Sequence, residues 1–186
     1  GRMVIGADGG HSPIAQAVGA PEYDAIPPLA TFYYSYFSGF VAHDIEQYVR
    51  DYQGTACFPT HAGLTLIATV WPSSRFHEIR GDIEGNVRKV HDSIPTVADR
   101  MRPARREERW FGTAGVPNFF RKPYGDGWAL VGDTGYDKDP LTAQGISDAF
   151  IDAENLSAAV DDGYAGRRPL EQALADYQAA RDQRAK

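Results

Sequence analysis

The stretch Trp128–Ala153 reads WALVGDTGYDKDPLTAQGISDAFIDA. Its apolar start, Trp128–Val131, predicts a strand that stops at Gly132–Asp133. A polar loop leads to Pro140, and a helix is then predicted whose opening turn, Ala143–Gly145, is almost free of side chains. Small residues let backbone N–H groups approach a ligand closely, and a helix N-terminus favours negative charge. The stretch therefore predicts a strand–loop–helix unit that can bind a ligand, although an ordinary junction has the same pattern.

A similar junction lies near the N-terminus. Val4–Ala7 predicts an apolar strand that breaks at Asp8–Gly9, and Ser12 is placed to cap a short helix with Pro13 at its first position. A carboxylate at the end of a strand can accept hydrogen bonds from sugar hydroxyls, as it does in dinucleotide sites. One Asp–Gly turn is weak evidence, but two such units in this order are much less common.

Together the two junctions resemble the second and third fingerprints of FAD-dependent monooxygenases of the para-hydroxybenzoate hydroxylase type. That family includes geranylgeranyl-reductase-like oxidoreductases. The segments FPTHAGLTLIATVWP and FFRKPYGDGWALVGDTGY also resemble its substrate domain, so the resemblance covers nearly the whole chain. The family's first fingerprint, a Gly-x-Gly-x-x-Gly after a strand, does not occur in this sequence. We therefore expect a fragment of a longer flavoprotein that lacks the N-terminal ADP-binding unit and is inactive by itself.

The resemblance implies an α/β (α+β) fold, in which an antiparallel-sheet substrate domain is inserted into a partial FAD-binding Rossmann-type domain. Residues 1–24 are expected to form the first piece of the FAD-binding domain, with the Asp–Gly motif. Residues 25–127 are expected to form the substrate domain. Residues 128–186 are expected to form the returning piece, with the Gly–Asp motif and the C-terminal helices.

Hydrophobic patterns predict the elements between the two junctions. Pro21–Pro28 has the composition of a linker, and Leu29–Val41 is typical of one long strand whose two aromatic faces are both covered. Thr55–Phe58 and Leu64–Trp71 predict further strands, and Asp82 is placed to cap a helix. We expect an antiparallel sheet with helices over one face.

Two helices are predicted near the C-terminus. The first should bury one stripe, composed of Ile146, Ala149, Ala153, Leu156 and Val160. Pro169 should open the second, whose apolar face is composed of Leu170, Ala173, Leu174, Tyr177 and Ala180.

Carried over residue by residue, the resemblance implies an FAD site. Asp133, which follows Gly132, matches the aspartate that contacts ribityl or ribose hydroxyls, and Pro140 matches the proline beside the flavin ring. Asp8 and Gly9 match a motif associated with both FAD and pyridine nucleotide. The helix start whose amides face the pyrimidine edge of the flavin corresponds to Ala143, Gln144, Gly145, Ile146 and Ser147. Amides there would stabilise negative charge on the reduced cofactor.

Three positions depart from the family pattern. Ala15 stands where an arginine is common, which puts the usual contact with the nicotinamide nucleotide in doubt. Tyr136 replaces a common histidine. Ala143 replaces the first glycine of a Gly-x-Gly. The substrate does not follow from the resemblance, and no catalytic residue is identified.

Substrate and metal sites are less well defined. Tyr34, Tyr36, Phe58 and Trp71 could shape an apolar substrate pocket, although core packing is the alternative for each of them. The 5 histidines are scattered, and no metal site is predicted.

Composition limits the partners. The 25 acidic and 19 basic residues give a net charge of −6, which argues against nucleic acid or an anionic membrane. The basic cluster Arg102–Arg109 contains Glu107 and Glu108 and is interpreted as a solvated segment. Cys57 is the single cysteine, so an internal disulfide is excluded and a reducing cytoplasm is expected. An exposed sheet edge would make a homodimer a candidate assembly.

We interpret the sequence as part of an FAD-dependent oxidoreductase, a monooxygenase that uses NADH or NADPH and hydroxylates a small apolar or aromatic substrate. One alternative is an FAD-dependent reductase of isoprenoid double bonds. An alternative from another class is a flavin-free module that binds small molecules on the aromatic sheet.

Overall fold

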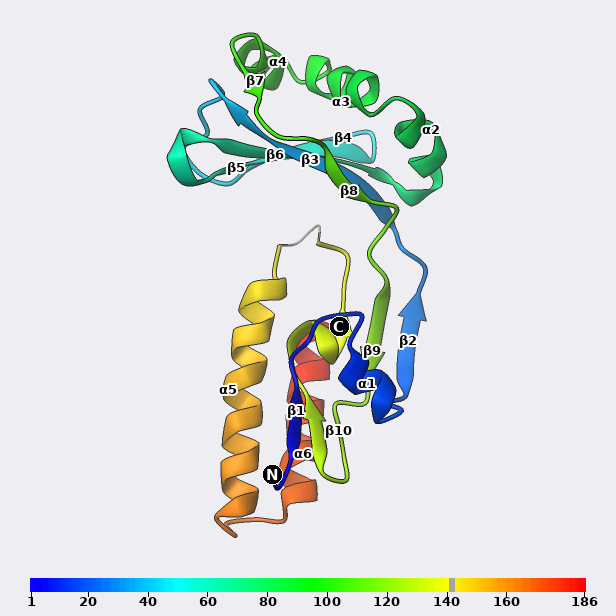
Figure 1. Cartoon of the computed structure of the whole chain (residues 1–186), viewed down its shortest axis with the longest axis vertical. Helices are drawn as coiled ribbons and strands as arrows, with labels where there is room; N and C mark the ends of the chain where they lie inside the picture. Colours follow the sequence, from blue (N-terminus) through cyan, green and yellow to red (C-terminus); the bar gives the residue numbers. More distant parts are fainter. Residues whose placement is uncertain (141–142) are drawn as a thin grey trace. The chain divides into compact units, whose positions relative to one another are not determined.

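A computed structural model of the protein describes residues 1–140 and 143–186. The chain has a mixed helix-and-sheet fold with two compact units (Figure 1). Unit 1 comprises Gly1–Pro27 and Pro117–Lys186, and unit 2 comprises Pro28–Val116. Residues 25–27 and 117–127, which were expected in the substrate domain, lie in unit 1, where their strands pair with other strands of that unit.

Unit 1 contains short strands and two long helices. Its elements are β1 (Val4–Gly6), α1 (Pro13–Ala17), β2 (Glu22–Ile26), β9 (Asn118–Arg121), β10 (Tyr124–Gly125), β11 (Trp128–Leu130), the 3-10 turn η3 (Gly132–Thr134), β12 (Tyr136–Asp137), α5 (Gly145–Tyr164) and α6 (Leu170–Ala185). One sheet has the order β1-β11-β10, and the other has the order β12-β9-β2.

The two strand–Asp/Gly junctions lie next to each other, as predicted. β1 pairs with β11 in parallel, with Val4 opposite Trp128 and Gly6 opposite Leu130. Ser12 caps α1 by accepting a hydrogen bond from the Ala15 amide at 2.8 Å, which confirms the predicted cap.

The prediction that Pro21–Pro28 is a linker is wrong, because most of this segment forms β2. β2 pairs with β9 in antiparallel fashion, and Arg121 of β9 donates hydrogen bonds to Glu22 of β2. Pairing with the distant strand β9 makes most of this segment a strand, and such pairing cannot be inferred from local composition.

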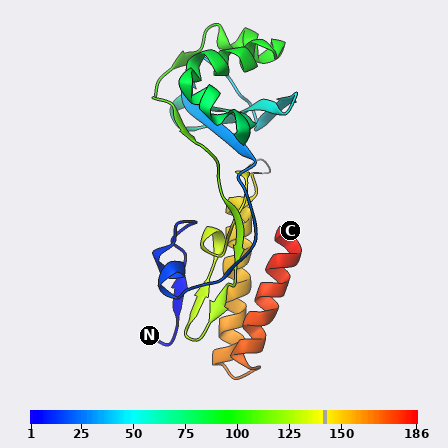
Figure 2. The same ribbon diagram turned by 90° about the vertical axis from the view of Figure 1, so that its right-hand side faces the viewer.

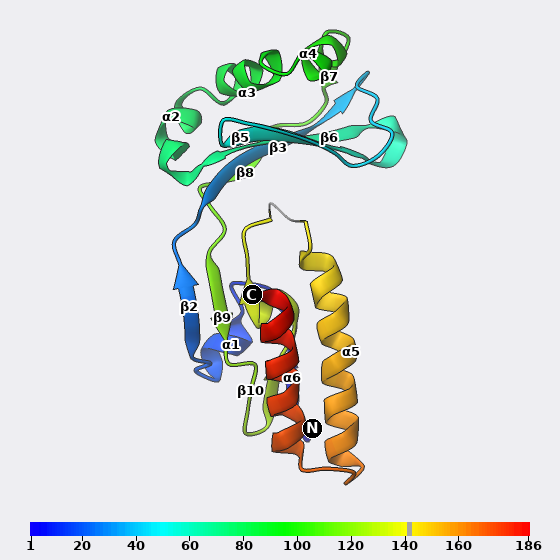
Figure 3. The same cartoon turned by 180° about the vertical axis from the view of Figure 1, so that it is seen from behind.

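The helices α5 and α6 lie side by side and pack against β11, as the three views of the chain show (Figures 1, 2 and 3). The apolar stripe predicted for α5 is correct at Leu156 and wrong at Ile146, which is 78% exposed, and at Ala153, which is also exposed. The first turns of α5 instead bury Asp148 and Asp152, because Arg184 of α6 forms ion pairs with both carboxylates. On α6, Ala173, Leu174 and Tyr177 are buried as predicted, whereas Ala180 is exposed.

Unit 2 is an antiparallel sheet with helices on one face (Figures 1 and 3), as predicted. Its elements are β3 (Ala30–Ser38), β4 (Glu46–Arg50), β5 (Gln53–Pro59), the 3-10 turn η1 (His61–Gly63), β6 (Thr65–Pro72), the 3-10 turn η2 (Ser73–Arg75), α2 (Phe76–Gly81), α3 (Ile83–Asp92), α4 (Pro95–Met101), β7 (Arg105–Arg106) and β8 (Phe111–Thr113). The strand order is β4-β5-β6-β3-β7, and β8 also pairs with β3.

Strand β3 is shorter than the predicted Leu29–Val41, and both of these end residues are exposed. Its side chains alternate between a buried face and a half-buried face. Tyr33 and Phe37 of the buried face join the core under the helices, whereas the face with Phe32, Tyr34 and Tyr36 stays partly accessible within unit 2. The expectation that both faces of this strand are fully covered therefore does not hold inside unit 2.

Asp82 caps α3 as predicted, because its carboxylate accepts a hydrogen bond from the Gly85 amide at 2.9 Å. No helix in the described part of the chain is long and apolar enough to span a membrane.

Candidate functional site

The candidate site is built where β1 and β11 end. Because the two strands are parallel and in register, the residues that follow them meet at the same edge of the sheet. Asp8 and Gly9 follow β1, and Gly132 and Asp133 form the turn η3 after β11. Ligand sites of α/β folds lie at such carboxyl ends of parallel strands.

Thr134 holds the two junctions together. Its side chain is fully buried, and its hydroxyl accepts hydrogen bonds from the amides of Asp8 at 2.8 Å and Gly9 at 2.9 Å. The hydroxyl also lies 3.2 Å from Asp8 Oδ1 and can donate to it. The role of Thr134 could not be predicted from the sequence, since a threonine after a Gly–Asp pair has no distinctive local signature.

The Asp8 carboxylate stabilises the turn in which it lies. It accepts hydrogen bonds from the Ser12 hydroxyl and from the Ile14 amide, so it anchors the start of α1. The hydrogen bond from Ser12 lowers the pKa of Asp8, and those from Ile14 and Thr134 act in the same direction against the effect of burial. This carboxylate is therefore ionised and occupied within the protein, whereas a Cβ at Gly9, which has φ 85°, would meet nothing within 4 Å.

Asp133 is placed differently from Asp8. It is exposed on η3, and its carboxylate accepts no hydrogen bond from the described residues. Gly132 before it has φ 60°, and a Cβ there would lie 3.2 Å from the Ala149 side chain. Glycine at this position lets η3 pack closely against the first turns of α5.

Asp137 is a further carboxyl beside the junction. Burial and then the charge of Asp133 raise its pKa to about 6. Its carboxylate closely approaches Gly10, where a side chain would collide with it. Asp137 thus packs against the backbone of the first junction, which is another contact between segments far apart in the sequence.

The start of α5 is open. Pro140 and Ala143 through Ser147 are all exposed, and no side chain among the described residues caps the helix at Gln144. Ala143 has φ 53°, in the left-handed region that glycine adopts most easily. A Cβ on Gly145 would meet nothing within 4 Å. This end of the helix therefore presents backbone with few obstructing side chains.

Ala15 and Tyr136, the other two departures from the family pattern, are both buried. Ala15 is 3% exposed on α1, so this position has little room for a long side chain. Tyr136 is buried, stacks on Phe120 with ring centroids 5.3 Å apart, and its hydroxyl lies 3.3 Å from Arg184. Burial raises the pKa of Tyr136, which therefore stays neutral in the core of unit 1.

The aromatic candidates for a substrate site divide between the two faces of the sheet in unit 2. Tyr34 and Tyr36 lie opposite Ala68 and Leu66 of β6, and Phe58 lies opposite the same Leu66, so the three aromatic residues share the accessible face. Trp71 is 1% exposed and packs in the core on the other face. The prediction of Trp71 as a pocket residue is wrong, because strand alternation turns it toward the helices.

Among the described residues, no group of three or more His, Cys, Asp or Glu side chains is arranged to hold a metal ion.

The family model described as FAD binding domain matches residues 1–186. The chain belongs to the FAD binding domain family. The cofactor of this FAD binding domain is accordingly FAD. Membership of this family confirms the predicted resemblance to FAD-dependent proteins. Assignment to the para-hydroxybenzoate hydroxylase type stays a prediction.

Solved structures share the fold of this FAD binding domain over 97% of its length. The flavin-dependent halogenase CmlS is 19% identical with a TM-score of 0.82, and the chain covers 34% of it. PqsL, a probable FAD-dependent monooxygenase from Pseudomonas aeruginosa, is 24% identical with a TM-score of 0.73, and 51% of it is covered. The myxobacterial chondrochloren halogenase CndH is 18% identical with a TM-score of 0.84, and 44% of it is covered.

The FAD binding domain thus spans between about a third and about half of the length of these proteins. No curated protein matches the chain.

Proposed function

We propose that the protein is an FAD-dependent monooxygenase that takes electrons from NADH or NADPH and uses O2 to hydroxylate a small apolar or aromatic substrate. The observation that carries the proposal is the joining of two strand–Asp/Gly junctions by Thr134, beside the open start of α5. FAD is taken as the cofactor because the chain belongs to the FAD binding domain family. Nucleic acid and membranes are not partners in this proposal, in keeping with the net charge of −6. A homodimer and a cytoplasmic location belong to it as well.

Asp133 fits the role of a ligand for a sugar hydroxyl of FAD. Its carboxylate is exposed and accepts no hydrogen bond from the described residues, so it is available to an external donor. The close packing of Gly132 against Ala149 holds η3, and with it Asp133, beside α5. Asp8 fits a supporting role, because its carboxylate anchors α1 while the open space at Gly9 leaves the backbone of the turn accessible.

The start of α5 fits the edge of a flavin ring. The exposed residues Ala143–Ser147 and the open space at Gly145 leave room for close approach. Bound FAD would supply the redox chemistry of the reaction. The positive end of the α5 dipole would stabilise negative charge on the reduced ring, and Pro140 would border it.

Unit 2 fits the role of a substrate domain. Tyr34, Tyr36 and Phe58 form a partly accessible aromatic surface on one face of the sheet. Such a surface would orient an apolar substrate and keep water away from it.

The variant Asp133→Ala, made in the protein as it is naturally encoded, tests the cofactor site. A hydrogen bond to a charged group contributes about 1.5–3 kcal/mol, so FAD affinity should fall about tenfold or more. Flavin fluorescence during titration measures the Kd. Asp126→Ala is the matched control, since Asp126 is an exposed carboxylate before β11, at the opposite end of that strand. Equal FAD affinity in Asp133→Ala and the wild type would remove Asp133 from the site.

Product analysis separates the candidate reactions. A hydroxylated product that requires O2 and NADH or NADPH supports the proposal. A halogenated product would place the protein with the reaction named for CmlS and CndH, whose fold it shares. Saturation of an isoprenoid double bond would favour the reductase. A folded, colourless protein without flavin would favour the binding module.

A further inference from the structure

The edge strand β4 of unit 2 has an open outer side. In the sheet order β4-β5-β6-β3-β7, no strand from the described part of the chain pairs with β4 on that side. The opposite edge is divided between β7 and β8, which have two and three residues, and both residues of β7 are exposed arginines. Short, charged edge strands resist pairing with another chain, whereas a longer edge with apolar side chains promotes it. The five-residue strand β4 is therefore the edge at which another strand can add.

The hairpin between β4 and β5 determines which backbone groups of β4 face outward. Its two turn residues, Asp51–Tyr52, have φ angles of 53° and 61°, as in a type I′ turn. Arg50 and Gln53 flank this turn and form a hydrogen-bonded pair, and such pairs alternate along an antiparallel ladder. The N–H and C=O groups of Gln47 and Val49 consequently point away from β5, toward the open side.

Exposed apolar side chains lie along the same edge. Val49 of β4 is 78% exposed, Ile45 just before the strand is 64% exposed, and Tyr52 in the turn is 91% exposed. Because Tyr48 packs partly against the core under the helices, Val49 beside it points to the face of the sheet without helices. An edge with this much exposed apolar surface is typical of a site for another chain.

We infer that a second copy of this chain binds here, with β4 of each copy paired in antiparallel fashion across a two-fold axis at Tyr48. This register places Gln47 opposite Val49 of the partner subunit, and each of the two symmetric pairs can exchange both of its N–H···O hydrogen bonds. Ile45 then lies diagonally from Val49 of the partner subunit, so that the two apolar side chains can cover each other.

The charges of β4 favour this register. Glu46 would lie opposite Arg50 of the partner subunit, and the two-fold axis repeats this contact. The Arg50 side chain is 66% exposed, lies 3.7 Å from Asp51 and donates one hydrogen bond to the Ser93 carbonyl, so other N–H groups of the guanidinium are available. Glu46 already accepts from Arg100 at 2.6 Å, and its carboxylate has capacity for a further donor.

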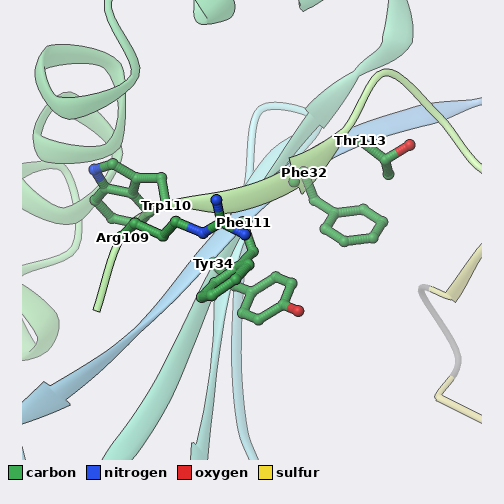
Figure 4. A pocket seen from close by; sticks show the side chains of 7 residues that line it. Phe32, Tyr34, Arg109, Trp110, Phe111 and Thr113 are labelled. Carbon is green, nitrogen blue, oxygen red and sulfur yellow. The ribbon is translucent and has the colours of Figure 1, made fainter. Parts of the chain in front are cut away.

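The pairing leaves the accessible face of the sheet open. A cavity of about 530 Å³ lies where β8 pairs with β3, and residues of β3 and of the segment 109–113 line it (Figure 4). β5 and β6 separate β3 from β4 in the sheet, so a strand added to β4 does not cover this cavity. The inference rests on the homodimer included in the proposed function and names the surface that forms it.

Sedimentation velocity of the chain at several concentrations tests the inference. The wild type should form a dimer that dissociates on dilution, because a five-residue strand edge is a small interface. Val49→Lys should raise the Kd of the dimer about tenfold or more, since it brings two ammonium groups close to the axis. Val4→Lys is the matched control: Val4 is 54% exposed on β1, an edge strand of unit 1, and this variant should dimerise like the wild type.

Cysteine crosslinking tests the register. In Tyr48→Cys the two introduced thiols face each other in a non-hydrogen-bonded pair, with Cα atoms about 4.5 Å apart, which permits a disulfide. Tyr52→Cys is the control, because Tyr52 is more exposed but its two copies would lie about 27 Å apart at about 3.4 Å per residue. Mild oxidation should crosslink Tyr48→Cys, and it should leave as single chains both Tyr52→Cys and the wild type, whose Cys57 is buried.

Circular dichroism of each variant establishes that the fold is retained. A wild type that is monomeric at all concentrations, an unchanged dimer in Val49→Lys, dissociation by Val4→Lys, or stronger crosslinking of Tyr52→Cys than of Tyr48→Cys would each overturn the inference. A separate FAD titration of the protein as it is naturally encoded decides the proposed cofactor chemistry. A monomer that binds FAD refutes only the inference, whereas a β4 dimer without FAD binding supports the inference and refutes the FAD-dependent reaction.

Discussion

Replacement of Thr134 by valine should loosen the connection between the two junctions of unit 1. Valine keeps the shape of the buried side chain and removes the hydroxyl that accepts from the amides of Asp8 and Gly9 and can donate to Asp8 Oδ1. Each hydrogen bond has a net value of about 0.5–1.5 kcal/mol. Because Asp8 is exposed and Gly9 is half-buried, both amides can partly recover hydrogen bonds to water. We therefore expect a cost of about 2 kcal/mol, which lies near the lower end of the sum.

Hydrogen exchange measured by NMR is the appropriate assay, since unfolding of a two-unit chain need not be a single transition. A loss of about 2 kcal/mol should accelerate exchange at the Asp8 and Gly9 amides by about thirtyfold. Thr134→Ser keeps the hydroxyl and should stay close to the wild type at these amides. FAD affinity should fall in Thr134→Val, because the turn after β1 is no longer held against η3. Wild-type exchange rates in Thr134→Val, or equal acceleration in Thr134→Ser, would show that the hydroxyl does not join the junctions.

Two further predictions concern the cores of the units. Burial lowers the pKa of His91 to about 4, and its Nε2 lies 3.0 Å from the Thr69 hydroxyl. The unfolded chain therefore takes up this proton first, so the stability of unit 2 should fall by about 3 kcal/mol as the pH drops from about 6.5 to about 4. Urea unfolding of wild type and His91→Gln across this range should show a shallower pH dependence in the variant, and parallel curves would contradict the reasoning. Arg184→Met should destabilise unit 1 by about 3–5 kcal/mol, since it leaves the buried Asp152 carboxylate without its ion pair. Thermal unfolding should show partial recovery in Arg184→Met/Asp152→Asn, and a single variant as stable as the wild type would refute the pairing.

The local parts of the fold follow from the sequence. The caps at Ser12 and Asp82 depend on a side chain that reaches an amide three residues away, so the local pattern is sufficient to predict them. The alternation of β3 and the apolar face of α6 likewise depend on neighbours along the chain. The two Asp–Gly junctions and their resemblance to a flavoprotein family were also readable, because those motifs are contiguous.

What tertiary structure decided depends on partners far apart in sequence. Arg184 stands 36 residues after Asp148 and 32 after Asp152, and only the packing of α6 on α5 makes these carboxylates buried residues in place of the expected apolar stripe. Thr134 and Asp8 are 126 residues apart, and the parallel pairing of β1 with β11 brings them together. Arg109 is exposed, as expected for a solvated cluster, and the pairing of β8 with β3 determines which ring its guanidinium covers, that of Phe111. Spacing along a chain predicts which side chains share a face of one element, whereas the partner that meets that face is selected only when the elements pack.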